Sequence, residues 1–368
     1  MPLAIHSYDA LPLLEDGPDV LNLAWTQDER SLLTADVHAL ISRALEREHR
    51  EGLPHIGSYM VKDPYGEGEL GDAVAAHFGV DRAGISVSCG SGVGPLLHNL
   101  TVLAAGATVR FSSDVYPDVP VWVERFRGHR SGSEAPDGTP EAVRELRVIE
   151  RDRPALVVLE RPALTPSRLS DLGELAALCE VGARYGALVV VDESNANYES
   201  PDYSAVGLVP AARNLIVVRG LSKAYGLGGL RLGFCVCHPE LAPTVRHVVP
   251  PLQASSLSLG LAREILGLGD IGGRLRAGVS GSRDRTVGLL GRFGVDGAEP
   301  ANGHLPYVLV REDARTWFAR LRRRGVQGKI HPFWSAGEGG FGHLLRLSVP
   351  LSRERRDRFR SLLEAQSP

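Results

Sequence analysis

Short apolar runs alternate with amphipathic stretches from about residue 70 to residue 250. The runs are rich in valine and leucine and are apolar on both faces, which is typical of strands buried in a parallel sheet. Between them, residues 171–186 place their apolar side chains about every 3.6 positions, a spacing that predicts a helix. This alternation predicts an α/β fold with a mostly parallel central sheet covered by helices on both faces. The predicted strands lie at 84–89, 107–111, 155–160, 187–192, 215–220 and 233–238.

The chain changes its rhythm after residue 250. Helical and strand patterns then follow in the order helix, strand, helix, strand, helix, at 255–294, 307–311, 313–325, 343–350 and 352–366. This order predicts a small α+β domain appended to the sheet. We therefore expect a large domain over 49–250, a small C-terminal domain over 251–368 and an N-terminal arm over 1–48 that joins the small domain.

Composition and charge narrow the classes of function. The chain of 368 residues is 43% hydrophobic and 23% charged, and its net charge of −3 provides no basic field for nucleic acid or an anionic membrane. No run approaches the length of a membrane span, and the first residues lack a signal-peptide pattern. The four cysteines form no C-x-x-C pair and are predicted to be buried thiols. We expect a reducing cytoplasm as the compartment and no metal site.

One lysine stands out because lysine is so rare. Among 41 basic Lys and Arg residues, the only lysines are Lys62, Lys223 and Lys329. Lys223 follows Ser222 after a predicted strand and precedes GLGGLRLG, where four glycines in eight residues let the backbone turn tightly. Arg231, within this stretch, is placed to hold an anion. Most loop lysines are simply solvated, but a buried lysine with a lowered pKa is what Schiff-base chemistry requires.

A glycine turn supplies the second candidate site. The stretch SCGSGVGPLLHNL at 88–100 predicts a strand, a turn and a helix that opens at Pro95. The free N–H groups at such a helix start bind phosphate. A dinucleotide fingerprint is the rival interpretation, but it needs glycine at the position of Pro95. A glycine turn without a ligand remains the alternative.

Three further side chains could carry chemistry. Asp192 follows four apolar residues and so lies at the carboxyl end of a strand, where α/β sheets place ligands. It could keep a cofactor ring nitrogen protonated, or simply cap a turn. Asp114 is expected to be a turn residue, whereas its neighbour Tyr116 offers a stacking surface. Arg346 is a lone arginine on an apolar strand, and a buried arginine needs an anion such as a substrate carboxylate.

In chain order these sites are a glycine turn, a tyrosine, D-E-S, S-K-x-Y-G-L-x-G-x-R-x-G and a late R-L-S. This series resembles the pyridoxal-phosphate enzymes of fold type I, in the class I/II aminotransferase group that includes histidinol-phosphate aminotransferase. The resemblance covers about residues 50 to 350. It implies pyridoxal 5'-phosphate as the cofactor and a homodimer with shared active sites. It also implies that Lys223 forms the Schiff base and moves protons at the substrate's α-carbon.

The resemblance assigns the other roles by position. Asp192 would pair with the protonated pyridine nitrogen, Ser194 would pack under the ring and Tyr116 would stack on its other face. Arg346 would bind the substrate's α-carboxylate. Tyr59 is a looser candidate to reach the partner's phosphate. The residues expected to hold the phosphate are Ser91, Gly92, Val93, Ser222 and Arg231.

The chain departs from the family pattern around one cofactor atom, the ring hydroxyl. Where the family has Asn-Pro-Thr-Gly, this chain reads ERPALTPSR, so that Leu164 or Thr165 replaces the asparagine that bonds the hydroxyl. Asn195 replaces the tyrosine that bonds the same oxygen, and we expect the Asn195 amide to bond it instead. Gly220 replaces a serine three residues before the lysine. Two losses around one oxygen suggest altered electronics at the imine and weaken the case for ordinary transamination.

Three hypotheses follow. The first is an aminotransferase acting on an α-amino acid or an amino-phosphate. The second is a lyase or cyclase similar to capreomycidine synthase, which eliminates or replaces a β or γ substituent in natural product metabolism. The third, a non-catalytic sensor, would carry a DNA-binding domain ahead of the fold, and the roughly 45 residues there show no helix-turn-helix pattern.

Recognition of the substrate side chain is expected to fall to residues 22–29 and 327–334. In the second segment, Lys329 and His331 could face a substrate anion or solvent, and the sequence slightly favours solvent.

Overall fold

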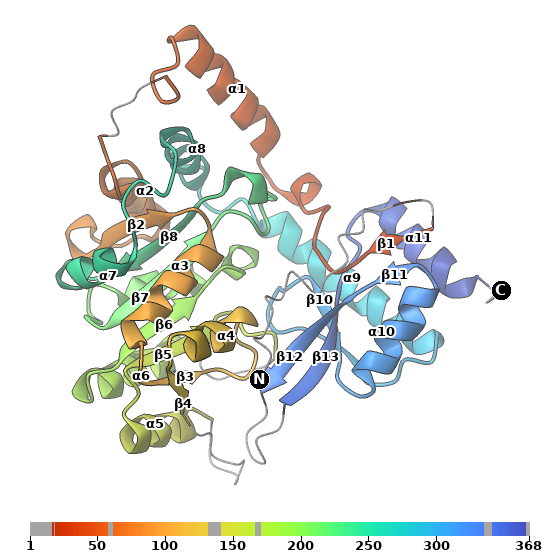
Figure 1. Cartoon of the computed structure of the whole chain (residues 1–368). Helices are drawn as coiled ribbons and strands as arrows, with labels where there is room; N and C mark the ends of the chain where they lie inside the picture. The colour runs from red at the N-terminus through yellow and green to blue at the C-terminus, as the bar shows by residue number, and fades with distance from the viewer. Residues whose placement is uncertain are drawn as a thin grey trace.

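The computed structural model describes residues 17, 19–57, 62–131, 141–165, 171–334 and 341–365. Its largest sheet has seven strands in the order β2-β8-β7-β6-β5-β3-β4 (Figure 1). All neighbouring pairs are parallel except the two that involve β8. The predicted α/β class with a mostly parallel sheet is therefore confirmed. The strands are β2 Ser86–Gly90, β3 Thr108–Phe111, β4 His129–Arg130, β5 Leu156–Glu160, β6 Leu188–Asp192, β7 Leu215–Gly220 and β8 Gly233–Cys237.

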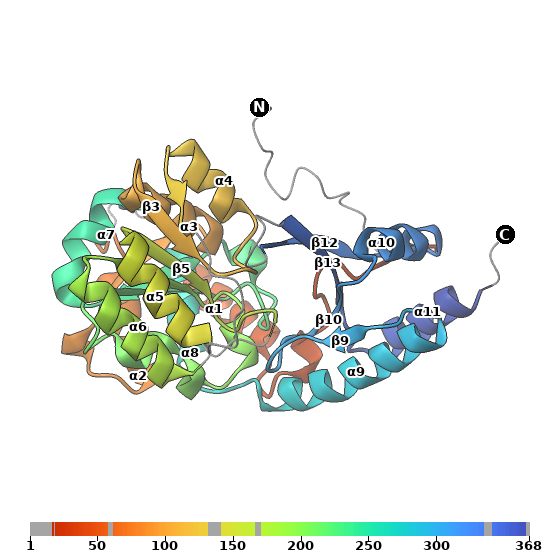
Figure 2. The same ribbon diagram turned by 90° about the horizontal axis from the view of Figure 1, so that it is seen from below.

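Helices lie on both faces of the large sheet (Figure 2). Alternate residues of its central strands pack into two separate cores, one on each face. On β6, for example, Val190 packs on one side, whereas Val189 and Val191 pack on the other. This two-sided burial explains why the strands read as continuous apolar runs. The first face is covered by α3 Val93–Thr101, α4 Asp118–Arg125 and α7 Ala242–Val248, and the second by α2 Glu67–Phe78, α5 Glu141–Asp152 and α6 Leu172–Arg184.

A second, antiparallel sheet of four strands lies in the C-terminal part, in the order β12-β13-β10-β9. Its strands are β9 Ala298–Pro300, β10 Tyr307–Val310, β12 Lys329–Trp334 and β13 Phe341–Ser348. The predicted helical region at 255–294 is two helices, α8 Ser256–Leu266 and α9 Gly273–Arg292. The remaining helices of this part are α10 Ala314–Arg323 and α11 Arg353–Glu364.

The N-terminal arm is joined to this C-terminal part by a short pair of β-strands. β1, Leu21–Asn22, pairs in parallel with β11, Val326–Gln327. The ladder continues where the amide of Leu23 donates to the carbonyl of Gln327 at 2.7 Å. Farther along, α1 Val37–Arg50 projects beside α8 at the far end of the molecule (Figure 1). The domain boundaries at residues 48 and 250 stay a prediction.

Two smaller expectations have clear outcomes. All four cysteines are buried free thiols, as predicted. The helix after the glycine turn begins at Val93 and not at Pro95, because Gly92 already serves as its N-cap. Across the described ranges, no helix combines the length and the apolarity needed to cross a bilayer.

Candidate active site

A cavity of about 590 Å³ opens at the carboxyl ends of β6 and β7, beside the N-terminus of α3. Asp192 and Lys223 reach it from the sheet side. Sequence reasoning selected many of its lining residues: Gly92, Val93, Tyr116, Asp192, Ser194, Ser222, Lys223 and Arg231. Parallel strands bring their carboxyl ends to one edge, which is why residues far apart in the sequence meet here.

The N-terminus of α3 and Arg231 together form a cradle for an anion. The guanidinium of Arg231 donates from Nη2 to the carbonyl of Ser91 at 3.0 Å, which fixes it beside the first turn of the helix. Gly92 has φ 121°, a conformation that favours glycine. A Cβ on Gly233 would lie 2.6 Å from the carbonyl carbon of Gly92. The end of β8 can therefore approach the cradle this closely only because residue 233 is glycine.

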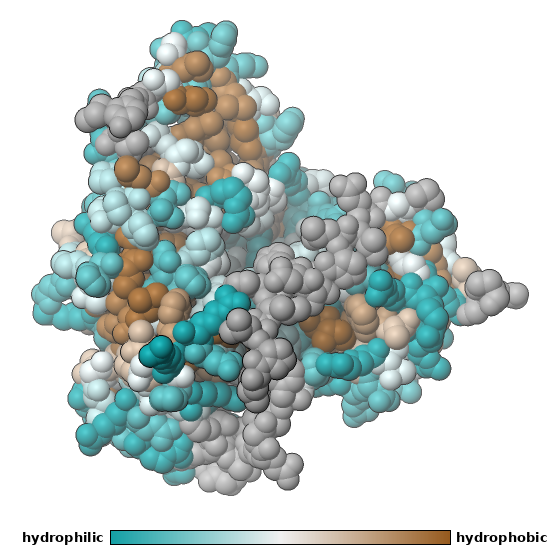
Figure 3. Space-filling view, viewed as in Figure 1, coloured by the Kyte–Doolittle hydropathy of each residue, from teal (hydrophilic) through white to brown (hydrophobic). Residues whose placement is uncertain are grey.

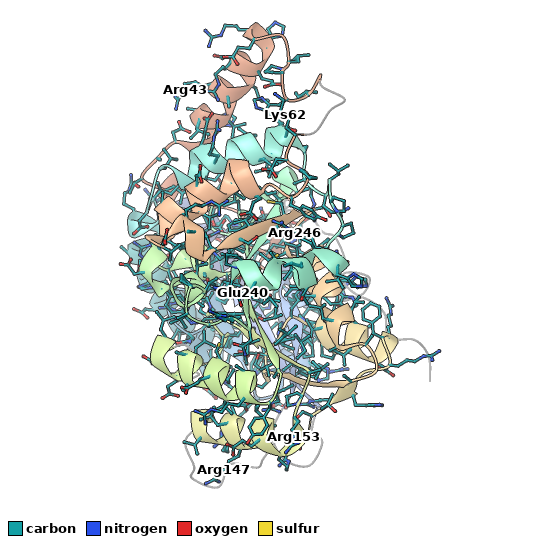
Figure 4. All side chains as sticks on the ribbon, turned by 90° about the vertical axis from the view of Figure 1, so that its left-hand side faces the viewer. Arg43, Lys62, Arg147, Arg153, Glu240 and Arg246 are labelled. Atoms are coloured by element: carbon teal, nitrogen blue, oxygen red, sulfur yellow. The ribbon has the colours of Figure 1, made fainter. Side chains whose placement is uncertain are left out.

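Lys223 places its amine inside the cavity, where Nζ donates to Oγ of Ser194 at 3.1 Å. Burial lowers the pKa of this amine, while the negative charges of Glu160 and Asp192 oppose that effect. By contrast, Lys62 is exposed and lies at the α1 end of the molecule (Figure 4). Lys223 thus has the surroundings expected of a nucleophilic lysine.

Asp192 ends β6 and holds its carboxylate in place with a local turn. Its Oδ1 accepts a hydrogen bond of 2.8 Å from the backbone N–H of Ser194. Burial raises the pKa of the Asp192 carboxyl, and the charge of Lys223 lowers it. A carboxylate so enclosed can keep a proton on a neighbouring ring nitrogen.

An aromatic wall closes one side of the cavity. Tyr116 lies with its ring centroid 5.7 Å from that of Trp122, and the ring of His98 meets Trp122 edge-on at 5.3 Å. Tyr116 is therefore available as a stacking surface. Sequence reasoning missed His98 and Trp122, because nothing in their local pattern shows which way α3 and α4 turn these side chains.

Arg346, on β13, is buried with 9% of its surface exposed. Its Nη2 donates to the carbonyl of Ala24 at 3.1 Å, and its guanidinium lies 4.4 Å from the ring centroid of Tyr307. Among the residues that the structure describes, its Nε has no hydrogen-bond partner. A buried cation held only by neutral groups is suited to receive an anion from outside the protein.

Lys329 and His331 do not face solvent, so the favoured interpretation of these two residues was wrong. Only 5% and 3% of their surfaces are exposed. The arm covers this part of β12, with Lys329 Nζ 5.6 Å from the ring centroid of Trp25. Lys329 also lies opposite Arg346 in the β12–β13 ladder. Burial, together with repulsion from Arg346 and Lys223, lowers the pKa of Lys329 to about 7.

Asp114 does more than form a turn. Its carboxylate is buried and accepts a hydrogen bond of 3.1 Å from the backbone N–H of Thr165. Burial raises the pKa of this carboxyl. The bond fixes the segment after β5, where the side chain of Leu164 is buried.

Asn195 is buried, and its amide is engaged by the protein itself. Its Nδ2 donates to Oε1 of Glu160 at 3.0 Å, and the Tyr307 hydroxyl donates to its Oδ1 at 3.5 Å. Glu160 was missed in the sequence, although its position at the end of an apolar strand, like that of Asp192, was a usable signal. Tyr59 lies outside the described residues.

Comparison with known proteins places the chain in a family. Residues 61–328 match the family described as Aminotransferase class I and II. The chain belongs to this family. The predicted kinship with fold type I pyridoxal-phosphate enzymes is thus confirmed, and pyridoxal 5'-phosphate is the cofactor.

The individual relatives share about 30% of their residues with this chain over the aligned parts. Histidinol-phosphate aminotransferase of Caldanaerobacter subterraneus is 30% identical over 52% of this chain and 52% of its own length. Aromatic amino acid aminotransferase of Mycolicibacterium smegmatis is 32% identical over 55% of this chain and 56% of its own. The chain thus spans about half the length of these two curated relatives. A match that spans 78% of this chain and 77% of the relative, at 29% identity, is histidinol-phosphate aminotransferase 1 of Mesorhizobium japonicum.

Solved structures share the fold at low sequence identity. The histidinol-phosphate aminotransferase of Sinorhizobium meliloti, in complex with pyridoxal-5'-phosphate, has a TM-score of 0.70 at 20% identity and covers 88% of this chain and 87% of its own. That of Clostridium acetobutylicum has a TM-score of 0.72 at 15% identity, covering 94% and 98%.

The cavity fits the cofactor by the chemistry of its residues. It offers an amine for the aldehyde at Lys223, a carboxylate for the ring nitrogen at Asp192 and an anion cradle for the phosphate at α3. The space in the cradle exists because Gly92 and Gly233 have no side chains.

Gly233→Ala should weaken cofactor binding because its Cβ would displace the first turn of α3. We expect the dissociation constant of pyridoxal phosphate to rise at least tenfold, or about 1.4 kcal/mol. Absorbance titration of the cofactor-free protein measures it. Gly229→Ala is the matched control, since a Cβ there meets no atom within 4 Å. Equal affinities in the two variants would contradict the cradle.

Proposed function

We propose that the protein is an aminotransferase-like enzyme that acts on an α-amino acid, or an amino-phosphate, carrying a second anionic group. The observation that carries the proposal is the convergence of a buried amine, a buried carboxylate and an anion cradle on one cavity. The amine is that of Lys223, the carboxylate that of Asp192, and the cradle that of α3 with Arg231.

When bound, pyridoxal phosphate supplies an electron-withdrawing ring that makes the substrate's α-hydrogen acidic. Lys223 anchors the cofactor and then moves a proton to and from the α-carbon. Its lowered pKa supports this role, because more of the amine is neutral near pH 7. Asp192 keeps the ring nitrogen protonated, Tyr116 packs on the ring, and Ser194 holds the Lys223 amine in place.

Arg346 orients the substrate's carboxylate, and Lys329 beside it favours a second negative group. Two buried cations face each other across the β12–β13 ladder, and like charges in this arrangement repel. A substrate with two anionic groups would relieve that repulsion. The second candidate function is the lyase or cyclase. It is favoured by the replacement of both expected ligands of the ring hydroxyl, one by Leu164 or Thr165 and the other by Asn195.

We further propose a homodimer in which a second copy covers α1 and the loop after it. This region exposes Leu45, Leu53 and Ile56, with 44%, 40% and 56% of their surfaces accessible. Figure 3 shows apolar side chains gathered along α1. Apolar patches of this kind mark protein–protein contacts.

We also propose that the protein works in the cytoplasm. All four cysteines are buried free thiols, which is typical of proteins in a reducing compartment.

Borohydride reduction of the cofactor-loaded enzyme should attach the cofactor to Lys223 alone. Peptide mapping by mass spectrometry identifies the labelled residue. Lys223→Ala should abolish the label, whereas Lys62→Ala should retain it. Label on Lys62 or Lys329 would overturn the assignment.

A panel of amino acids and amino-phosphates should reveal the preference for a second anion. Formation of pyridoxamine phosphate, followed by mass spectrometry, should be fastest for dianionic substrates. Because Lys329 is charged below its pKa of about 7, the preference should fade as the pH rises through that value. Lys329→Met should remove both the preference and its pH dependence.

Arg346→Ala should weaken binding of all carboxylate substrates by about 2–5 kcal/mol.

The same panel separates the two candidate reactions. Loss or exchange of a side-chain group, without pyridoxamine phosphate, would reject transamination in favour of the lyase or cyclase.

Leu45→Glu should weaken self-association because it places a charge in the apolar surface of α1. We expect the dimer fraction in analytical ultracentrifugation to fall, while Glu46→Gln on the same helix leaves it unchanged. A wild-type protein that sediments as a monomer at all concentrations would contradict the dimer.

A further inference from the structure

A second acidic side chain stands beside Asp192, and none of the roles above uses it. Glu160 ends β5 and pairs with Asp192 in the parallel register of β5 and β6. Residues in register on neighbouring strands carry their side chains on the same face, about 4.8 Å apart. Glu160 therefore points, with Asp192, to the α3 side of the sheet.

The only hydrogen-bond partner of the Glu160 carboxyl in the described part of the chain is Asn195, whose Nδ2 donates to Oε1 at 3.0 Å. The hydroxyl of Tyr307 donates to the amide oxygen of Asn195 at 3.5 Å. With the amide oxygen directed at the Tyr307 hydroxyl, the NH₂ group of Asn195 faces the acid. A neutral amide steadies the carboxyl without neutralising a charge.

A neighbouring glutamate shows how the same fold surrounds another buried acid with cations. Glu193 is fully buried on the opposite face of the sheet. It pairs with Arg161 at 2.9 Å and with Arg219 at 2.8 Å. It also accepts a hydrogen bond from the backbone N–H of Ala205 at 2.7 Å. No ion pair of this kind reaches Glu160 within the described ranges.

Charged groups from four other elements face Glu160. Asp192 on β6 and Asp114 after β3 repel its negative form, whereas Lys223 after β7 and Arg346 on β13 attract it. Burial is the largest influence, and with Asp192 it raises the pKa of Glu160 to about 8. Lys329 on β12 is a further cation that interacts with the same carboxyl. Near pH 7 the Glu160 carboxyl therefore carries its proton.

We propose that Glu160 and Asn195 form a proton-holding pair that sets the charge on the Lys223 nitrogen. Glu160 then acts as a positioning residue, because it works through Lys223. The proposal rests on the proposed role of Lys223. Ionised Glu160 and Asp192 each favour the protonated form of Lys223, against the effect of burial. While Glu160 keeps its proton, only Asp192 opposes that effect, and the nitrogen gives up its proton more readily.

Glu160→Gln tests the pair because it keeps the shape and the Asn195 contact but cannot ionise. We would follow the visible absorbance of the cofactor-loaded enzyme against pH, without substrate. In the wild type, the absorbance change that reports loss of the proton from the Lys223 nitrogen should be shallower than that of a single group. Glu160 ionises in the same pH range, and its negative charge then makes the nitrogen hold its proton more tightly. In Glu160→Gln the transition should become single-site, and its midpoint should fall by about one pH unit.

Glu180→Gln is the control for loss of a carboxylate, since the side chain of Glu180 is 70% exposed on α6. It should titrate like the wild type. If Glu160→Gln also titrates like the wild type, the proposal is wrong.

Infrared difference spectra across the same pH range provide a second readout that does not require the cofactor. A protonated-carboxyl band should disappear as the pH rises in the wild type and should be absent in Glu160→Gln. If that variant does not fold, Asn195→Ala should shift the loss of the band to higher pH, because it removes the donor that stabilises the ionised acid. No such band in the wild type, or an unchanged midpoint in Asn195→Ala, would overturn the pair.

These readouts keep the two proposals apart. A titrating Glu160 band in a protein whose reduced label falls on another lysine would refute the role of Lys223 and leave the acid–amide pair intact. A label on Lys223 without the band would do the reverse.

Discussion

The charge on Lys223 depends on two opposing influences: burial, which is the larger and lowers the pKa of its amine, and nearby negative charge, which raises it. Burial alone favours the neutral amine, whereas full pairing with a carboxylate would fix it as a cation. The parallel order of β5, β6 and β7 brings Glu160 and Asp192 to the edge where Lys223 begins its loop. Neither acid makes an ion pair with the amine in the described structure, and Ser194 holds Nζ at 3.1 Å. The influence of the acids on the amine is therefore set by position more than by direct contact.

The charged groups around the site come from different parts of the chain. The large sheet supplies Asp192, Glu160 and Asp114, while the antiparallel sheet supplies Arg346 and Lys329. Charges in a cavity of this kind interact more strongly than they would in bulk water. The antiparallel sheet therefore adds two cations, Arg346 and Lys329, to a site where Lys223 and Arg231 already stand beside the acids of the large sheet.

The sequence could predict those features that depend on residues close together in the chain, and could not predict those that depend on tertiary contacts. Strands buried on both faces appear as apolar runs, so their ends could be located, and with them Asp192. The glycine turns around Lys223 are also a local signal. Lys329 was misjudged because its burial depends on Trp25, about 300 residues away in the chain. The aromatic wall formed by Trp122 and His98 depends on how α3 and α4 pack against each other. The hydrophobic periodicity of the sequence carries no information on that packing.

The length of the N-terminal arm is constrained by contacts at both of its ends. Residues 21–22 are held in the ladder with β11, and the next turn of chain presents the Ala24 carbonyl to Arg346. Only twelve residues later α1 begins, with Oδ1 of Asp36 capping it through the N–H of Ala39 at 2.9 Å. A deletion between these two anchors would strain the ladder or the start of the helix. Losing the ladder would withdraw the carbonyl from the guanidinium. Under the proposed role of Arg346, changes of length in this connector, which looks like an ordinary loop, would act on substrate choice.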